Sequence, residues 1–497
     1  MLDISTNPTE LLLCQYRKQR GVNLGSWFVL ERWITDHPFR SAQAPAQSDL
    51  DVARGSNAKE ILEEHWDNFI VEQDWAWIAE RGMNAVRLPI GYYHLCGVDP
   101  SVLVGTPFQD FEFVFSGAWT RIVKAIESAG RYGLGVLIDL HAAPGKQNRD
   151  SHAGTSDPPK FFSDKRYRSH TIDVLCTLLK ALVSHAESRS PPLTNLLGIE
   201  LLNEPQPGTD YDLQTWYTSA IRHLRAIDPS IPLYLSECWR THEYTSFVEK
   251  LSASLKQSLI VLDHHLYRCF TPEDIATPAR EHARRLADPS SDTPRTLGQA
   301  SERLGSHMGG LIVGEWSGAL NPGSLTGAPE EQKEYVQAQL QLYERSCAGW
   351  FFWTYKKQQA GDTGWSLRDA VGGGVFPEWV GMRRTREVVR DEERRAKVRD
   401  EERDEALAQH TQYWSQYGGK YEHWRFGEGF VKGWDAGYIF LDSNQDDPYG
   451  RVMELGFKGA WARRVARNYG KLYWEYEHGF IQGADTAKRD YLQSYCS

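Results

Sequence analysis

Two alternating patterns of apolar and polar residues fill the first three quarters of the chain. Short, almost continuous apolar runs indicate strands covered on both faces, because they are too apolar to face water and too short for buried helices. Between them, apolar residues recur at helical spacing. The apolar runs predict strands at residues 21–27, 84–90, 135–141, 197–203, 232–237, 259–267, 310–316 and 349–355. The clearest helical segments lie at residues 119–131, 172–185, 213–227 and 330–345.

This alternation predicts an α/β fold. Strands that alternate with helices form parallel βαβ units, and eight such units indicate a closed (β/α)8 TIM barrel, here over residues 1–380. Active sites of such barrels lie at the C-terminal ends of the strands. Polar side chains end the predicted strands and are expected to share one rim: Glu31, Arg87, His141, Glu204, Glu237, His265 with Tyr267, Glu315 and Trp353.

The pattern changes after Pro377. Residues 383–405 are nearly all Arg, Glu, Asp and Lys. Such a segment predicts a solvated helix with pairs such as Asp391 with Arg395 and Glu393 with Lys397. We therefore expect residues 381–410 to form a charged helical linker.

The last segment, residues 411–497, is rich in aromatic side chains. It has 20 of them in 87 positions, against 12% in the whole chain. Within residues 456–476, Phe457, Trp461, Val465 and Tyr469 recur every four positions, which predicts a helix with one buried face. The expected structure is a mainly helical appendage packed on the barrel. The alternative is a module that binds sugars by stacking them on exposed rings.

Composition narrows the class of partner. The chain has 497 residues, of which 41% are hydrophobic and 25% charged, as in soluble globular proteins. Its net charge of −10 disfavours nucleic acid or an anionic membrane as the main partner. No apolar run reaches the roughly 18 residues of a transmembrane helix. The N-terminus lacks a secretory apolar segment, and the seven cysteines are scattered without a CxxC pair, so we expect free thiols and a cytoplasmic location.

No cofactor and no metal are expected. The adjacent His264 and His265 point to opposite sides of a strand, and no further ligand stands at a suitable spacing. His264, His152 and Cys269 are therefore interpreted as structural or incidental. Glu237 has two equally weighted interpretations, support of the site or structural pairing.

Two glutamates close apolar runs, Glu204 in the tripeptide NEP (203–205) and Glu315 in GEW (314–316). Burying an unpaired charge is costly, so each carboxylate must lie at an open strand end or be held by partners. Paired carboxyl groups cleave glycosidic bonds: one protonates the leaving oxygen, and the other, at about 5–5.5 Å, attacks the sugar with net retention. Because the fourth and seventh strands lie on opposing sides of a barrel mouth, we expect the two glutamates to flank a sugar. A lone NEP can also be a simple turn.

The two carboxyl groups are expected to differ in pKa. Arg87 and Tyr267 are placed to hold Glu315 ionised, since a cation and hydrogen-bond donors lower a carboxyl pKa. Glu204 should have the higher pKa and be protonated in the resting enzyme. Asn203 is placed to hydrogen-bond the 2-hydroxyl of the sugar.

Seven motifs, in this order along the chain, resemble glycoside hydrolase family 5, and most closely its fungal exo-β-1,3-glucanase branch. The motifs are RGVNLGSWFVLE (20–31), AVRLPIGYY (85–93), IDLHAAPGKQN (138–148), NEP (203–205), DHHLY (263–267), VGEWS (313–317) and FFWTYK (351–356). The resemblance spans residues 15–380.

This resemblance implies a role for each site residue. Glu204 is the expected acid/base and Glu315 the expected nucleophile. Glu31 is expected on glucose hydroxyls, Trp353 as the stacking floor, and Phe270 as half of an aromatic clamp at the entrance. The residues expected around the glucose of the −1 subsite are Arg87, His141, Asn203, His265 and Tyr267.

The chain also departs from the secreted members of this family. They carry an aromatic residue shortly after the pair Gln147-Asn148, where this chain has no ring. Asp150 either replaces that ring or, with a shift of one residue, matches the sugar-binding aspartate that follows it in those members. Without that ring, the sequence predicts the binding of a long glucan less strongly. The aromatic C-terminal segment resembles instead an intracellular fungal branch.

Three functions follow as hypotheses. The first is a retaining β-glucosidase or exo-β-1,3-glucanase that hydrolyses β-linked glucose from the non-reducing end of a glucoside or glucan oligosaccharide. The second keeps the chemistry but acts on a glycolipid, such as a steryl or ceramide glucoside, with the aglycone near Phe270. The third is a non-catalytic carbohydrate-binding barrel, against which the two intact carboxylates argue.

Overall fold

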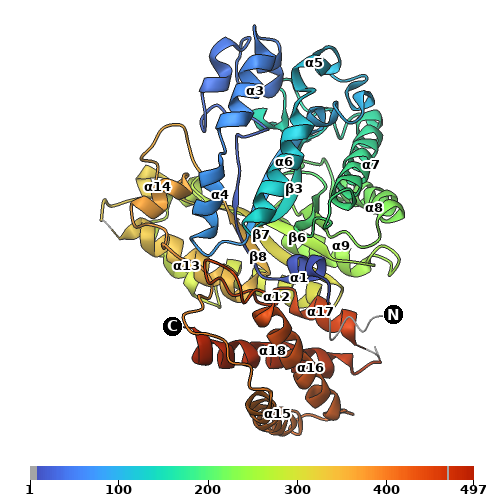
Figure 1. Cartoon of the computed structure of the whole chain (residues 1–497), viewed down its shortest axis with the longest axis vertical. Helices are drawn as coiled ribbons and strands as arrows, with labels where there is room; N and C mark the ends of the chain where they lie inside the picture. Colours follow the sequence, from blue (N-terminus) through green and yellow to red (C-terminus); the bar gives the residue numbers. More distant parts are fainter. Residues whose placement is uncertain (1–7, 329, 467–469, 497) are drawn as a thin grey trace.

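The computed structural model describes residues 8–328, 330–466 and 470–496 (Figure 1). Within these residues, eight parallel strands close into a barrel in chain order. The predicted (β/α)8 class is therefore confirmed. The strands are β1 Gln19–Asn23, β2 Ala85–Gly91, β3 Gly135–Ala142, β4 Leu196–Glu200, β5 Leu233–Ser236, β6 Ile260–Arg268, β7 Gly309–Leu320 and β8 Gly349–Phe352.

Helices surround the barrel, and all four predicted helices are present as α6, α7, α8 and α13. Each buries an apolar stripe; in α6 the stripe includes Ile122, Ala125, Ile126 and Ala129. No helix in the described part of the chain is both long and apolar enough to cross a membrane. The helices before the C-terminal region are α1 Glu10–Tyr16, α2 Asp49–Ala53, α3 Ala58–Asn68, α4 Glu72–Ala79, α5 Glu112–Phe115, α6 Ala118–Arg131, α7 Lys165–Glu187, α8 Asp210–Ile227, α9 Thr241–Lys250, α10 Pro272–Ala276, α11 Ala279–Ala287, α12 Asp292–Gly305, α13 Glu331–Ser346 and α14 Leu367–Gly372.

Some strands end earlier or later than the apolar runs predict. β4 stops at Glu200, so Asn203 and Glu204 lie beyond the strand and not at its last position. Leu201 and Asn203 still donate main-chain hydrogen bonds to neighbouring strands, and the chain turns at Glu204, which has a φ of +42° and is followed by Pro205. β7, in contrast, continues past Glu315 to Leu320.

Four helices, α15 Glu392–Trp414, α16 Trp424–Asp442, α17 Lys458–Val465 and α18 Tyr473–Tyr495, form a separate layer below the barrel (Figure 1). We call them the helical unit. α16 and α18 run parallel with their backbones in close contact. A side chain at Gly429 would meet the carbonyl oxygen of Tyr476 at 2.0 Å, and one at Gly433 would meet that of Phe480 at 1.9 Å.

The expected single helix over residues 456–476 is wrong. The chain forms α17, leaves it after Val465, and begins α18 at Tyr473. Phe457 and Trp461 are buried as predicted, whereas Tyr469 lies outside the described residues. Val465 is half-buried, so the four-residue spacing marks full burial at Phe457 and Trp461 and does not require one continuous helix.

The charged segment also differs from a simple solvated linker. Its helix, α15, begins only at Glu392, and two of its arginines hold the neighbouring helices. Arg394 pairs with Asp490 of α18 at 2.6 Å, and Arg395 pairs with Asp442 of α16 at 2.7 Å. α15 thus packs within the helical unit, while the domain boundaries at residues 380 and 410 remain a prediction.

The helical unit covers the N-terminal ends of the strands. Residues 454–457 run beside residues 16–18, where the backbone N–H of Lys18 donates to Glu454 O at 2.7 Å. The rings of Tyr16 and Trp461 meet edge to face, with centroids 4.9 Å apart. One apolar cluster joins the barrel to the helical unit. Its barrel residues include Leu137, Leu197, Val261, Ile312 and Phe351. On the other side it includes Phe440, Trp461 and Phe480 of the helical unit, with Leu455 and Phe457 of the segment between α16 and α17.

Candidate active site

A cavity of about 900 Å³ opens at the C-terminal ends of the strands. Seven of the ten predicted site residues line it, and the other three, Arg87, Asn203 and His265, lie directly behind its wall through the contacts described below. The main lining residues are Glu31, Trp33, His141, Asp150, His152, Glu204, Trp239, Tyr267, Phe270, Glu315, Trp353 and Trp365.

Glu204 and Glu315 face each other in this cavity. An oxygen of Glu204, an oxygen of Glu315 and a ring nitrogen of His265 all lie within 4.8 Å of one another. The Nδ1 atom of His265 is 2.6 Å from Glu204 Oε1 and 3.4 Å from Glu315 Oε2. This spacing is close to the roughly 5–5.5 Å between carboxyl groups of retaining glycosidases and far from the roughly 6.5–9.5 Å of inverting ones.

Glu204 sits on a turn that the loop after β3 holds in place. Its φ of +42° lies in the left-handed region, which is unfavourable for a residue other than glycine and persists only when neighbours fix it. Asn148 Nδ2 donates to Glu204 O at 3.1 Å, and Gln147 Nε2 donates to Asn203 O at 3.0 Å. In return, the N–H of Gln206 donates to Gln147 O at 3.1 Å. The Gln147-Asn148 pair therefore positions the turn that carries Glu204.

Glu315 is fixed at both of its carboxylate oxygens. Arg87 Nη1 donates to Oε1 at 2.9 Å, and the Tyr267 hydroxyl donates to Oε2 at 2.8 Å. The register of β7 shifts against both neighbouring strands here, which re-aims the side chain into the cavity. Gly314 permits this, because a Cβ there would lie 1.9 Å from Asp263 Oδ2.

Arg87 lies behind Glu315 with no exposed surface. Its Nη2 atom is 3.1 Å from Asp139 and donates to Asn203 Oδ1 at 2.9 Å, and its Nε donates to Glu200 at 2.7 Å. Asp263 is the fourth carboxylate, at 3.8 Å. A single guanidinium thus holds four buried carboxyl groups and orients Asn203, so it acts as a positioning group rather than as a wall of the cavity.

The remaining predicted residues form the side and entrance of the cavity. His141 and Trp353 lie nearly parallel, with ring centroids 5.7 Å apart, and Asp139 Oδ2 holds His141 Nδ1 at 2.6 Å. Glu31 Oε2 accepts a hydrogen bond from Trp33 Nε1 at 2.7 Å. Phe270 stands at the entrance with 67% of its surface exposed.

The sequence matches the family model "Cellulase (glycosyl hydrolase family 5)" over residues 52–359. The chain belongs to glycosyl hydrolase family 5. A second match, to the "Glucan 1,3-beta-glucosidase 3 C-terminal domain", covers residues 395–490 and thus most of the helical unit.

Relatives agree with this assignment to family 5. "Glucan 1,3-beta-glucosidase 3" of Schizosaccharomyces pombe is 30% identical over 478 residues, which cover 93% of this chain and 94% of the relative. "Probable glucan 1,3-beta-glucosidase A" of Aspergillus clavatus is 30% identical over 390 residues, 72% of this chain and 87% of the relative. The crystal structure of rutinosidase from Aspergillus niger shares the fold, with a TM-score of 0.58 at 18% identity over 73% of this chain and 98% of that chain. The chain is a glycoside hydrolase.

The order of the two carboxyl pKa values in this family 5 site is the reverse of the prediction. Burial raises the pKa of Glu315 to about 7, despite the opposing charges of His265 and Arg87. Burial also acts on Glu204, but the hydrogen bond and charge of His265 outweigh it and lower the pKa of Glu204 to about 2. Burial disfavours a charged His265, yet the charges of Glu315 and Asp263 raise its pKa well above the usual range.

The sequence argument placed the acidic proton on Glu204 alone because it did not include His265 as its hydrogen-bond partner. The hydrogen bond of 2.6 Å between Glu204 Oε1 and His265 Nδ1 favours the charged form of Glu204 and so lowers its pKa. The lowered pKa of Glu204 and the raised pKa of His265 favour a carboxylate on Glu204 and a protonated imidazole on His265.

Sequence analysis missed several residues of the site. His152, expected to be incidental, lines the cavity with Nδ1 3.1 Å from His141 Nε2. Trp239 lines the entrance and donates through Nε1 to His265 O at 2.9 Å. The prediction selected side chains at the ends of predicted strands. Because neither His152 nor Trp239 ends a strand, it did not include them. Glu237, by contrast, is fully buried and pairs with His264, which favours its structural interpretation.

Proposed function

We propose that this family 5 enzyme is a retaining β-glucosidase that releases glucose from the non-reducing ends of β-glucosides, with β-1,3-glucan oligosaccharides as its main substrate class. The observation that carries the proposal is the facing pair Glu204 and Glu315 with oxygens within 4.8 Å. The names of the two glucan 1,3-β-glucosidase relatives support the choice of linkage.

In the first step, Glu315 attacks the anomeric carbon C1 while the bond from C1 to the leaving oxygen breaks. The proton of the hydrogen bond between His265 and Glu204 passes through Glu204 to that oxygen, and a glycosyl-enzyme ester forms on Glu315. In the second step, Glu204 takes a proton from water, whose oxygen attacks C1. The ester bond breaks, glucose leaves with the β configuration, and Glu315 is again a carboxylate.

The neighbours of the two glutamates have supporting roles in this proposal. Arg87 and Tyr267 hold Glu315 in line for attack. Oδ1 of Asn203 accepts from Arg87, and Nδ2 lies 3.4 Å from His141 Nε2. The second N–H of Nδ2 is the proposed donor to the 2-hydroxyl of the sugar, where contacts strengthen in the transition state. Glu31 and His141 are polar partners for the other hydroxyls, and the ring of Trp353 is the stacking surface.

Paired substitutions test the mechanism. Glu315→Ala should lower kcat on aryl β-glucosides by at least about 10⁴-fold, the scale of losing a nucleophile. Azide should restore turnover and give the α-glucosyl azide, because it enters from the vacated side. Glu204→Ala should keep glycosylation of good leaving groups, which need little protonation, and lose about 10²–10⁴-fold on poor ones. If each variant shows the phenotype expected of the other, the assigned roles of Glu204 and Glu315 are reversed. A product of inverted configuration from the unmodified enzyme would refute retention.

A glycolipid substrate is the second candidate function. The observation in its favour is the apolar entrance, where Trp239 is 52% and Phe270 is 67% exposed. Exposed rings of this kind suit either a second sugar or an apolar aglycone. Initial rates on laminari-oligosaccharides, steryl glucoside and glucosylceramide in detergent separate the two candidates. A higher kcat/KM on the lipid glucosides would replace the glucan assignment and leave the mechanism intact.

A further inference from the structure

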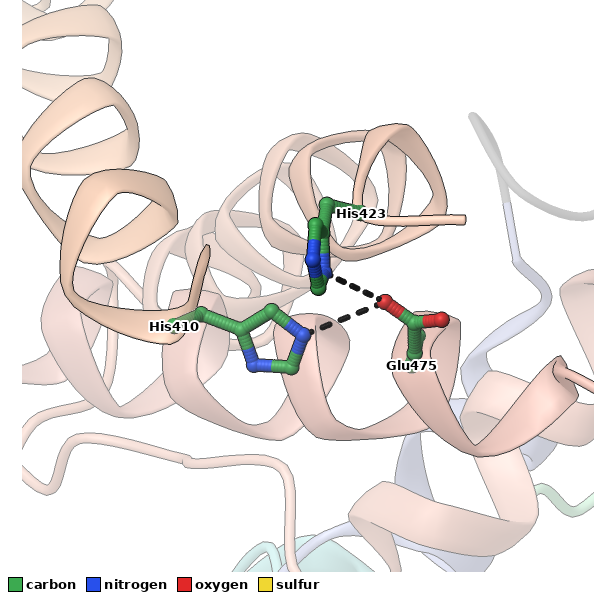
Figure 2. A group of neighbouring side chains, drawn as sticks. All are labelled: His410, His423 and Glu475. Carbon is green, nitrogen blue, oxygen red and sulfur yellow. Dashed lines mark hydrogen bonds and ion pairs between the residues drawn. The ribbon is translucent and has the colours of Figure 1, made fainter. Parts of the chain in front are cut away.

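Three side chains of metal-ligand type converge in the helical unit, at the end of the molecule opposite the catalytic cavity. His410 comes from α15, His423 immediately precedes α16, and Glu475 lies in the first turn of α18. Figure 2 shows both imidazole rings directed at one oxygen of the carboxylate. His410 Nε2 is 3.2 Å and His423 Nδ1 is 3.0 Å from Glu475 Oε2.

These distances fit the ligand shell of a small divalent ion. Four ligands at about 2.0–2.1 Å from a tetrahedral zinc stand about 3.3 Å from one another. The two observed nitrogen–oxygen distances are close to that edge, and all three atoms lie within 4.8 Å of one another. Two imidazole nitrogens and one carboxylate oxygen are also a donor set that zinc uses, with the fourth position left to water.

The surroundings of Glu475 give an independent reason to expect a cation. Its side chain has no exposed surface, and His410 is nearly as buried. Within residues 8–328, 330–466 and 470–496, the ion-pair partners of Glu475 are His410 and His423, and no lysine or arginine is among them. A buried carboxylate needs a compensating charge, and a divalent ion between the three side chains would supply it.

The second oxygen of the carboxylate is already engaged. The backbone N–H of Glu422 donates to Glu475 Oε1 at 2.7 Å, which fixes the plane of the carboxylate and leaves Oε2 toward the histidines. Outer contacts of this kind orient the ligands of metal sites. His423 remains about one quarter exposed at its side chain, which gives an ion a route from solvent.

We propose that His410, His423 and Glu475 bind one zinc-type divalent transition-metal ion that ties together α15, the start of α16 and the start of α18. Its role is structural. The three elements meet at this point from distant parts of the sequence, so the ion stabilises the helical unit that covers the lower end of the barrel. The sequence expectation of no metal rested on the spacing of ligands along the chain, and it did not weigh this cluster, whose members come together only in the fold.

Metal titration of the full-length protein tests the proposal. After treatment with a chelator and dialysis, the protein should bind about one equivalent of Zn²⁺ in calorimetry and melt at a higher temperature with Zn²⁺ than without. Co²⁺ should give the strong visible absorption of a four-coordinate site. Absence of saturable Zn²⁺ binding, or a weak six-coordinate Co²⁺ spectrum, would mean that the cluster is only a hydrogen-bonded triad and would overturn the proposal.

Substitutions locate the ion. His423→Gln keeps an amide donor toward Glu475 at a partly exposed position. Without metal, the variant should therefore have the same melting temperature as the wild type. It should bind Zn²⁺ at least about 100-fold more weakly, since even outer partners of a metal are worth roughly 10–100-fold. His410→Gln should do the same. The matched control is His223→Gln, an exposed histidine on α8 whose ring contacts Ser219 O, and its binding should be unchanged. Equal weakening in the control and the ligand variants would refute the assignment.

Discussion

Each end of the barrel buries an arginine among carboxylates. Acidic groups outnumber cations at the mouth, whereas cations outnumber acidic groups at the lower end. At the mouth, Arg87 has no exposed surface and faces four acidic side chains: Asp139, Glu200, Asp263 and Glu315. At the lower end, Arg20 is 3% exposed and pairs with Glu344 and Glu454. There two further cations join, Lys18 near Glu344 at 3.9 Å and Lys488 beside Glu454 at 2.5 Å.

This difference separates a reactive site from a structural one. At the mouth the acidic groups outnumber the cations, and burial raises the pKa of Glu315 to about 7. At the lower end burial opposes ionisation too, but Arg20 and Lys18 outweigh it and lower the pKa of Glu344 to about 2. Glu344 at the lower end is always charged and paired and holds two layers together, whereas Glu315 at the mouth is poised between its two protonation states.

The largest expected effect is the loss of the lower layer. Ending the chain after residue 380 removes Leu455, Phe457, Trp461 and Phe480, which cover the apolar lower end of the barrel. Each large apolar side chain is worth about 1.5–3 kcal/mol of burial, so their sum rivals the roughly 5–15 kcal/mol that stabilises a protein. Soluble yield and melting temperature should fall sharply. A barrel of unchanged stability that loses affinity only for polymeric glucan would make the helical unit a binding module instead.

Next in size is the removal of the guanidinium at the mouth. Arg87→Met leaves four buried carboxyl groups around an apolar side chain and should cost about 3–5 kcal/mol in urea unfolding. It should also lower kcat of the remaining folded enzyme, because Glu315 loses the donor to Oε1.

Arg20→Met is the matched substitution at the lower end. It should cost less, about 1–3 kcal/mol, because Lys18 and Lys488 still accompany the two glutamates. The kcat per folded molecule should not change. If both arginine variants lose stability equally, or if Arg20→Met also lowers kcat, the contrast between a reactive and a structural cluster fails.

Sequence patterns were sufficient for the layers and for the residues that end strands. Glu31, His141, Glu204, Tyr267, Glu315 and Trp353 were found because a parallel barrel brings the C-terminal ends of its strands together. The pattern could not place His152 or Trp239, which lie on loops whose conformation depends on contacts distant in the sequence. It also gave the wrong pKa order for Glu204 and Glu315, because it left out the hydrogen bond and charge of His265 on β6, which lower the pKa of Glu204.

In the helical unit, too, the sequence pattern predicted burial but not the contacts between distant segments. Aromatic spacing identified Phe457 and Trp461 as buried, but it did not reveal that α17 ends at Val465 and that α18 begins at Tyr473. The acidic and basic residues of α15 were expected to face solvent, and two of its arginines instead reach Asp442 and Asp490 of other helices. Charge patterning along one helix does not reveal partners that tertiary packing supplies.

A smaller effect should appear in the pH dependence. The pKa of Glu315 in the folded enzyme, about 7, lies above its ordinary value, so the carboxylate takes up a proton as the pH falls through 7 and can no longer attack. The acidic limb of kcat/KM should therefore have its midpoint near pH 7 and fall about tenfold per pH unit below it. Tyr267→Phe removes a hydrogen bond that lowers this pKa, so the limb should move to higher pH. A wild-type midpoint between pH 4 and 5 would contradict the raised pKa.

The smallest effect should come from the exposed rings of the mouth, which unlike those of the lower end do not hold layers together. Phe270 is 67% exposed and lies beside Tyr267 and Trp365 at centroid distances of 5.7 and 6.1 Å. Phe270→Ala should leave the melting temperature unchanged, because exposed substitutions usually change stability by no more than about 0.5 kcal/mol. It should raise KM for laminari-oligosaccharides about 2- to 10-fold, since a stacking contact is worth about 0.5–1.5 kcal/mol. The matched control is Phe113→Ala, an equally exposed ring (62%) on α5 that does not line the cavity, for which KM should not move. If Phe270→Ala lowers the melting temperature instead of raising KM, the ring belongs with the packed rings of the lower end, and the division between the two ends of the barrel does not extend to its aromatic residues.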